Sequence, residues 1–176
     1  MNTSFFKKIG LYDFLNIETE MSKPELIQKL KKMSYESSLD IFSVADYAIP
    51  NRFEYKGLIN ENNFILRRRK HFFDSKNPNP NITGIIDEKN GKTFIKTEFM
   101  PAKYLVLIHI LLSLLFLAIS FAVNETGIKI FILVMLLIVN SSHYFAMKTA
   151  IKKNKYDFER ELNYIIQKNN YFKGYQ

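Results

Sequence analysis

The sequence of 176 residues has no cysteine and only three histidines. Without cysteine there can be no disulfide, no thiolate metal site and no cysteine nucleophile, and the chain fits a reducing compartment. It also lacks a Gly-rich phosphate loop, a His-Glu zinc helix and a clustered carboxylate motif. Because no set of nucleophile, base and orienting group can be assembled, we expect that the chain is not an enzyme.

The formal charge of +8 is divided between the two ends of the sequence. Residues 1–103 and residues 148–176 each carry a net charge of +4, whereas Glu125 and Lys129 cancel in the apolar stretch between them. Basic residues on both sides of an apolar stretch suit an anionic membrane surface. Nucleic acid is the competing partner for a basic chain, and we consider it the less favoured one here.

The apolar stretch predicts two transmembrane helices. Residues 104–123 contain no formal charge and would form a helix about 30 Å long, which matches the hydrocarbon core of a bilayer. Residues 128–147 carry one charge, Lys129, which lies near the end and can reach the interface. The connection of residues 124–127 is so short that the two helices must form an antiparallel hairpin. The sequence therefore predicts an integral membrane protein.

The distribution of lysine and arginine predicts the orientation of this hairpin. Basic residues precede the first span and follow the second, but the loop between the spans has none. Both termini should therefore be cytoplasmic. The sequence Asn124-Glu125-Thr126 matches a glycosylation sequon, but it abuts the bilayer and we reject it. We expect no signal peptide at the N-terminus, because lysines interrupt its apolar residues.

Four polar residues inside the spans form a predicted intramembrane cluster. His109 and His143 would lie at a similar depth in an antiparallel hairpin, with Ser113 and Asn140 close by. Polar groups in hydrocarbon usually hydrogen-bond between helices, and this is the interpretation we favour. The alternatives are a haem or metal held by the two imidazoles, or a proton-linked switch. We expect no cofactor.

Residues 1–103 predict an α+β head. A helix should begin near Ser22, where Pro24 and Glu25 suit a first turn, and a second short helix is possible over residues 40–47. Alternating apolar residues predict an antiparallel meander of four or five strands. The segments involved are residues 11–20, 53–59, 63–73, 82–86 and 93–99, with Asn90-Gly91 as the strongest hairpin signal.

The most distinctive segment of the head is a run of basic residues, Arg67, Arg68, Arg69, Lys70 and His71. On a strand, Arg67, Arg69 and His71 would share one face. We favour a solvated strand end that is kept positive beside an anionic leaflet. Guanidinium groups also suit the capture of an anionic lipid or ligand. Nucleic-acid binding with help from Phe72 and Phe73 is a third, minor interpretation.

Residues 148–176 predict a basic tail with an amphipathic helix. Phe158, Leu162, Ile165 and Ile166 share one helical face. We favour docking of this face on the head. The alternatives are a helix that lies on the lipid surface, or one that pairs with another protomer and so contributes to a homo-oligomer.

The combination of Tyr55-Lys56-Gly57, Asn63-Phe64 and the basic segment with a two-span hairpin resembles small bacterial membrane proteins of no known function. The resemblance covers residues 14–147 and implies a bacterial inner-membrane setting without a known activity. A looser likeness is to the two-span β-barrel effectors of bacterial antiphage defence, whose barrels bind cyclic nucleotides. In those proteins the spans come first, so the order is reversed.

These observations predict three parts: a cytoplasmic head (residues 1–103), a transmembrane hairpin (104–147) and a cytoplasmic tail (148–176). The expected function is that of a membrane-anchored binding or regulatory module. The alternative is a ligand-gated membrane effector, in which an anionic ligand at the Arg67–His71 strand drives the spans to oligomerise.

Overall fold

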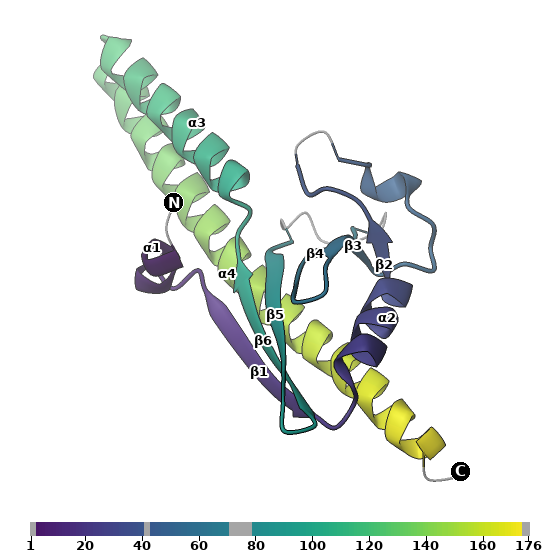
Figure 1. Cartoon of the computed structure of the whole chain (residues 1–176). Coiled ribbons are helices and arrows are strands. Elements are labelled where there is room, and N and C mark those ends of the chain that lie inside the picture. Colours follow the sequence, from purple (N-terminus) through teal and green to yellow (C-terminus); the bar gives the residue numbers. More distant parts are fainter. Residues whose placement is uncertain (1–2, 41–42, 71–78, 174–176) are drawn as a thin grey trace.

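The computed structural model of the chain describes residues 3–40, 43–70 and 79–173, with side chains as far as Lys168. Figure 1 shows a sheet that lies across the lower half of a long helix, whose upper half projects with a second helix beside it. The elements are α1 (Thr3–Lys8), β1 (Asp13–Thr19), α2 (Lys23–Met33), β2 (Ser34–Glu36), η1 (Asp46–Ala48), β3 (Tyr55–Ile59), β4 (Asn63–Arg68), β5 (Asn81–Lys89), β6 (Lys92–Met100), α3 (Lys103–Ala122) and α4 (Thr126–Lys173).

The described strands form one six-stranded sheet in the order β1-β6-β5-β4-β3-β2. Strands β3 to β6 follow one another as an antiparallel meander, as the alternating pattern predicts. The hairpin between β5 and β6 turns at Asn90 and Gly91, whose φ angles of 54° and 74° are those that a tight two-residue turn requires. The predicted α+β class and this hairpin are therefore confirmed.

The sheet differs from the predicted meander at both edges. Strand β1 pairs with β6, the last strand, through a long-range contact that no local pattern announces. Strand β2 follows α2 directly and pairs parallel to β3, so the sheet is not wholly antiparallel. Where the structure describes the region of the short helix expected over residues 40–47, the one helical element is η1, of three residues.

Helix α4 is one continuous element of 48 residues, about 72 Å long. It contains neither glycine nor proline between Ile128 and Lys173, so nothing interrupts its hydrogen bonds. The boundary drawn from the sequence after Met147 falls inside this helix. One rigid element therefore joins the candidate span to the tail.

The second half of α4 covers the core face of the sheet. Phe158, only 1% exposed, packs its ring against Tyr55, Phe64 and Phe99, with ring centroids 5.7, 6.0 and 6.0 Å away. Gly84 makes this possible, because a Cβ atom there would lie 2.1 Å from the Phe64 ring. The predicted docking of the tail helix on the head is confirmed by Phe158 and by Leu162, which is also 1% exposed.

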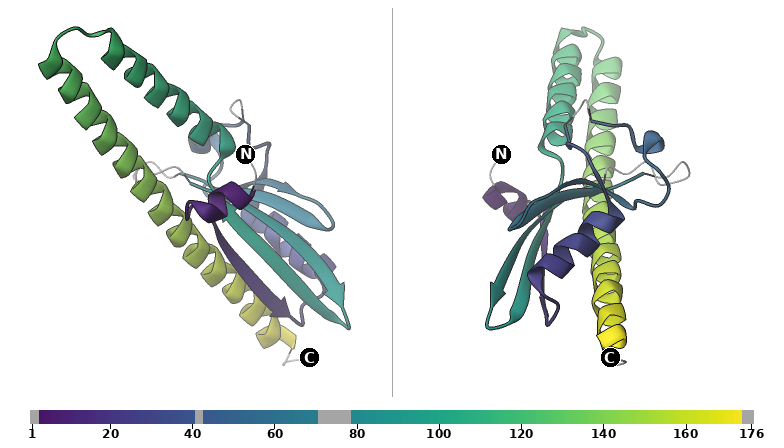
Figure 2. Two further views of the ribbon diagram at one scale, coloured as in Figure 1. Left: turned by 90° about the vertical axis from the view of Figure 1, so that its left-hand side faces the viewer. Right: turned by 45° about the vertical axis from the view of Figure 1, so that its right-hand side comes forward.

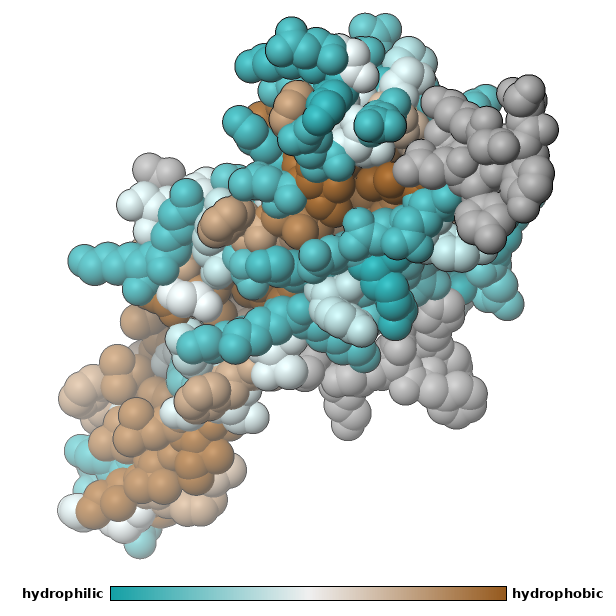
Figure 3. All heavy atoms as spheres, turned by 90° about the horizontal axis from the view of Figure 1, so that it is seen from below, coloured by the Kyte–Doolittle hydropathy of each residue, from teal (hydrophilic) through white to brown (hydrophobic). Residues whose placement is uncertain are grey.

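The first half of α4 packs against α3 as an antiparallel pair that extends away from the sheet (Figure 2). In the most apolar stretch of each helix, only 6% of the residues of α4 and 11% of those of α3 are buried inside the protein. These stretches are therefore not the core of a soluble domain. Brown, apolar residues cover the projecting pair, whereas the head seen from this side is mostly hydrophilic (Figure 3). Both helices are long and apolar enough to cross a membrane.

Candidate functional site: a basic cavity where the sheet meets the helix pair

An open cavity of about 830 Å³ lies at the junction between the head and the α3–α4 pair. One wall is basic and comes from β3, β4 and the residues after β4: Lys56, Arg67, Arg68 and Lys70. The opposite wall comes from the two long helices and is mainly apolar, with Leu105, Ile138, Val139 and Ala146. Asp46 is the one carboxylate among the described lining residues. A cavity of this volume is in the range that holds a small-molecule ligand.

Arg67 is the buried cation of this cavity, with 8% of its surface exposed. Its Nε and Nη2 atoms donate to Asn81 Oδ1 at 3.0 and 2.7 Å, and its Nη1 atom donates to the Tyr104 hydroxyl at 2.9 Å. Nη2 also donates to the Leu39 carbonyl at 3.3 Å. All these partners are neutral, and no carboxylate among the described residues pairs with Arg67. A buried charge without a counter-ion is costly, so this guanidinium favours an anion beside it.

Lys56 is also buried, but it has its own counter-ion. Its ammonium group lies 2.6 Å from an Asp46 carboxylate oxygen and donates to the Val44 carbonyl at 2.9 Å. The other Asp46 oxygen accepts the backbone N–H of Lys70 at 3.0 Å. Asp46 therefore neutralises Lys56 and ties the segment around η1 to the end of β4.

Lys70 differs from Lys56, because in the described part of the chain no carboxylate pairs with its ammonium group. It is partly exposed and lines the cavity. Together with Arg67, it leaves two positive charges on the basic wall without a counter-ion among the residues that the structure describes. The wall is therefore suited to an anion such as a phosphate.

Arg68 also lines the cavity, but its charge is already paired within the protein. It forms ion pairs with Glu54, at 2.7 Å, and with Asp157 of α4. Arg69 is buried and donates to the Ile49 carbonyl at 2.8 Å. These two arginines hold β4 to the rest of the protein, Arg68 through ion pairs and Arg69 through hydrogen bonds.

The predicted solvated strand end is wrong. Arg67 and Arg69 are only 8% and 3% exposed, because the segment before β3 folds over the end of β4. In the described part of the basic run, Arg68 and Arg69 anchor the strand, and Arg67, Arg68 and Lys70 line the cavity. His71, Phe72 and Phe73 lie outside the described residues.

The four polar residues of the predicted intramembrane cluster lie together. Asn140 Oδ1 is 3.0 Å from His109 Nε2 and accepts the Ser113 hydroxyl at 3.0 Å. The His109 and His143 rings stack, with centroids 4.0 Å apart and planes inclined by 21°. His143 also lines the basic cavity. The cluster and the cavity are thus adjacent, and one residue belongs to both.

The stacking of the two histidines bears on the haem and metal interpretations. Two axial ligands must stand on opposite sides of the macrocycle, but no macrocycle fits between rings whose centroids are 4.0 Å apart. No group of three or more His, Cys, Asp and Glu side chains in the described segments could hold a metal ion. The arrangement instead suits hydrogen bonding between the helices.

Sequence reasoning did not assign Lys56, Asp46 or Tyr104 to the site. Tyr104 stands at the first turn of α3, where an aromatic residue signals a membrane interface, and this signal could have linked it to the basic strand. Lys56 lies opposite Arg67 in the β3–β4 register, which the short turn between these strands could have suggested. Asp46 lies in a segment without a clear pattern, and no signal pointed to it.

The fold and the cavity define a class of protein. It has a six-stranded, mostly antiparallel sheet followed by two helices that could cross a membrane, with a basic cavity at the junction. No protein-family model matches the chain, and no curated protein matches it in sequence. The resemblance to small bacterial two-span proteins therefore stays a prediction.

Proposed function

We propose that this protein is a membrane-anchored binding module of the bacterial inner membrane, with its head at the cytoplasmic face and an anionic ligand in the basic cavity. The observation that carries the proposal is Arg67. Its guanidinium is buried, has only neutral partners among the described residues, and lines a cavity large enough for a ligand. An anion would supply the missing counter-charge.

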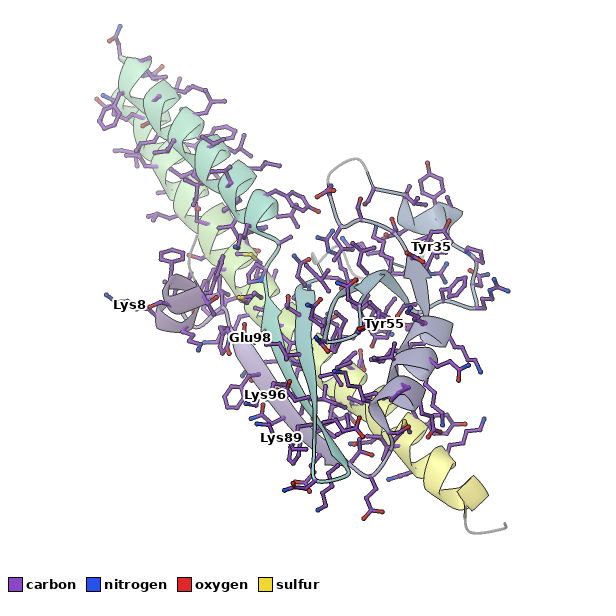
Figure 4. All side chains as sticks on the ribbon, viewed as in Figure 1. Lys8, Tyr35, Tyr55, Lys89, Lys96 and Glu98 are labelled. Carbon is purple, nitrogen blue, oxygen red and sulfur yellow. The ribbon has the colours of Figure 1, made fainter. Side chains whose placement is uncertain are left out.

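The membrane anchor is supported by the apolar surface of the α3–α4 pair. The side chains that radiate from this pair are almost entirely carbon (Figure 4). Helix α1 and the second half of α4 both lie on the head side of the hairpin, as a two-span topology with cytoplasmic termini requires (Figure 1). Tyr144 and Lys148 stand where the helix pair meets the head, and Tyr144 donates to the Ile9 carbonyl at 2.9 Å. Tyrosine and lysine at this level suit a bilayer interface.

The orientation is tested with topology reporters fused at Met1 and at Gln176 of the full chain. Both fusions should report the cytoplasm, since the basic residues flank the spans on one side only. A periplasmic signal from either fusion would overturn the proposed orientation.

Anion binding is tested by thermal unfolding of the full-length protein in detergent, with inorganic phosphate, anionic lipid micelles or neutral lipid micelles added. At least one of the anions should raise the unfolding temperature of the wild type. The Lys70→Gln and Arg67→Gln variants should lose this response. Lys153→Gln, which removes an exposed charge on α4 away from the cavity, is the matched control. An equal loss in the control, or no response to any anion, would overturn the proposal.

A ligand-gated effector is the second candidate, and the continuity of α4 favours it. The same helix lines the cavity, forms half of the hairpin and packs on the sheet, so a ligand could bias the arrangement of the spans. Overexpression with and without the anion found above, followed by membrane-leakage and growth measurements, tests this candidate. Leakage that requires the anion and Arg67 would favour the effector over a plain binding module.

A further inference from the structure

We propose that the anionic ligand is a phospholipid of the cytoplasmic leaflet, whose phosphate binds the basic wall while its acyl chain lies along α4. This inference rests on the proposed function and specifies the ligand.

The two walls differ in the chemistry that they can bind. Arg67 and Lys70 present positive charge that the described residues do not neutralise, which suits a phosphate group. The facing wall is mainly hydrocarbon from Leu105, Ile138 and Val139, and it carries no formal charge. A free phosphate would satisfy the first wall and leave the second in contact with water. A phospholipid satisfies both at once.

The apolar wall continues out of the cavity along the surface of the helix pair. Ile138, Ser142 and Ala146 line the cavity on one stripe of α4, because residues four apart share a helical face. This stripe is about 12 Å long. At its far end Ile138 and Val139 are 57% and 49% exposed, so no described part of the chain covers them. In the proposed bilayer the cavity therefore opens sideways into the lipid.

His143 adds a polar group at an intermediate depth. Its Nε2 atom is buried and has no hydrogen-bond partner among the described residues, although the residue lines the cavity. A buried polar atom without a partner is rare and calls for one. The ester and hydroxyl oxygens of a glycerol backbone stand between the phosphate and the acyl chains of a phospholipid. His143 lies between the basic and apolar groups in the same way.

The test is native mass spectrometry of the full-length protein in detergent with dioleoyl phosphatidylglycerol and dioleoyl phosphatidylcholine at equal concentration. The wild type should retain the anionic lipid in preference to the neutral one. Arg67→Gln should reduce this preference roughly tenfold or more, because it removes a charge-assisted contact. Lys70→Gln should reduce it as well, and Lys153→Gln should leave it unchanged. Since the Lys70 ammonium forms no hydrogen bond or ion pair with the described residues, its variant remains informative even if Arg67→Gln does not fold.

A second variant separates a lipid from a free anion. Ala146→Phe fills the apolar stripe and leaves the basic wall intact, so it should reduce lipid retention but preserve the thermal stabilisation by inorganic phosphate. An excess of inorganic phosphate should not displace the lipid from the wild type. If phosphate displaces it and Ala146→Phe has no effect, the lipid inference is wrong while anion binding stands. If neither phosphate nor lipid binds, the proposed function fails together with the inference.

Discussion

The two halves of α4 bury their apolar side chains in different ways. Up to Met147 the helix exposes large residues on several sides, among them Phe131, Leu137 and Ile138, which are 64%, 69% and 57% exposed. Beyond this point Phe158 and Leu162 are 1% exposed, and charged residues such as Lys152 and Lys153 face outward. One continuous helix thus changes from apolar on all sides to amphipathic.

This difference shows what each half needs around it. An amphipathic helix is satisfied by one apolar surface, and the sheet supplies it. A helix that is apolar on all sides needs an apolar environment all round, which α3 alone cannot provide. The comparison therefore favours lipid around the first half and protein around the second.

Phe158→Ala should destabilise the head by about 3–5 kcal/mol, because it leaves a cavity among three aromatic rings. The measurement is urea unfolding of the full-length protein in detergent. Tyr164→Ala on the same half of α4 is the control, since Tyr164 is 63% exposed and should change the stability little. Equal effects of the two variants would show that the sheet does not bury this half of α4.

Thr149→Pro should cost about 3 kcal/mol or more, because proline inside a helix removes a hydrogen bond and clashes with the preceding turn. Thr149 is exposed and lies just beyond the point where the two halves meet, so the change tests their continuity. Circular dichroism and thermal unfolding in detergent measure the effect. Thr149→Ala is the control and should behave like the wild type. If the proline variant is also unchanged, the two halves are not joined by one rigid helix.

Much of the sheet and of the hairpin could be predicted from the sequence, because their signals are local. Alternating apolar residues predicted β3 to β6, and Asn90-Gly91 predicted the turn between β5 and β6. The length of the apolar runs predicted the two long helices. The pairing of β1 with β6 could not be predicted in this way. It joins residues far apart in the chain, and alternation does not reveal which strand lies next to which.

The site was predicted only in part, for a related physical reason. The basic run was visible in the sequence, but the burial of Arg67 and Arg69 depends on the segment that folds over them, which has little pattern of its own. The depth match of His109 and His143 could be worked out, because helix geometry fixes the rise per residue. The position of His143 at the cavity could not be worked out in this way, because it depends on how α4 packs on the head.

The polar cluster between α3 and α4 should contribute modestly to the stability of the helix pair. His109→Leu should loosen the pair by about 0.6 kcal/mol, and by no more than about 1.7 kcal/mol, since interhelical hydrogen bonds in membranes are weak. Paired His109→Cys and His143→Cys changes should crosslink under oxidation, and the chain has no other cysteine to interfere. Ile110→Cys with His143→Cys is the control pair. Better crosslinking in the control would show that the register of the two helices is different.

The smallest expected effect is a change in how the unfolding free energy depends on pH. It concerns the half of α4 that the sheet covers. Burial raises the pKa of Glu161. The carboxylates of Glu54 and Asp157 raise this pKa further, whereas the nearby Tyr55 hydroxyl and Arg68 lower it, and burial has the largest effect. The folded protein therefore holds this proton more tightly than the unfolded chain does. The stabilisation from the protonated carboxyl is fully present below its ordinary pKa and is lost as the pH rises through the raised one. Glu161→Gln should flatten this part of the curve of unfolding free energy against pH. Glu159→Gln, on the same helix, is the control. If the slope over the acidic range is the same in the wild type and in Glu161→Gln, then Glu161 is not buried against the sheet, and the division of α4 into a lipid half and a protein half would have to end before it.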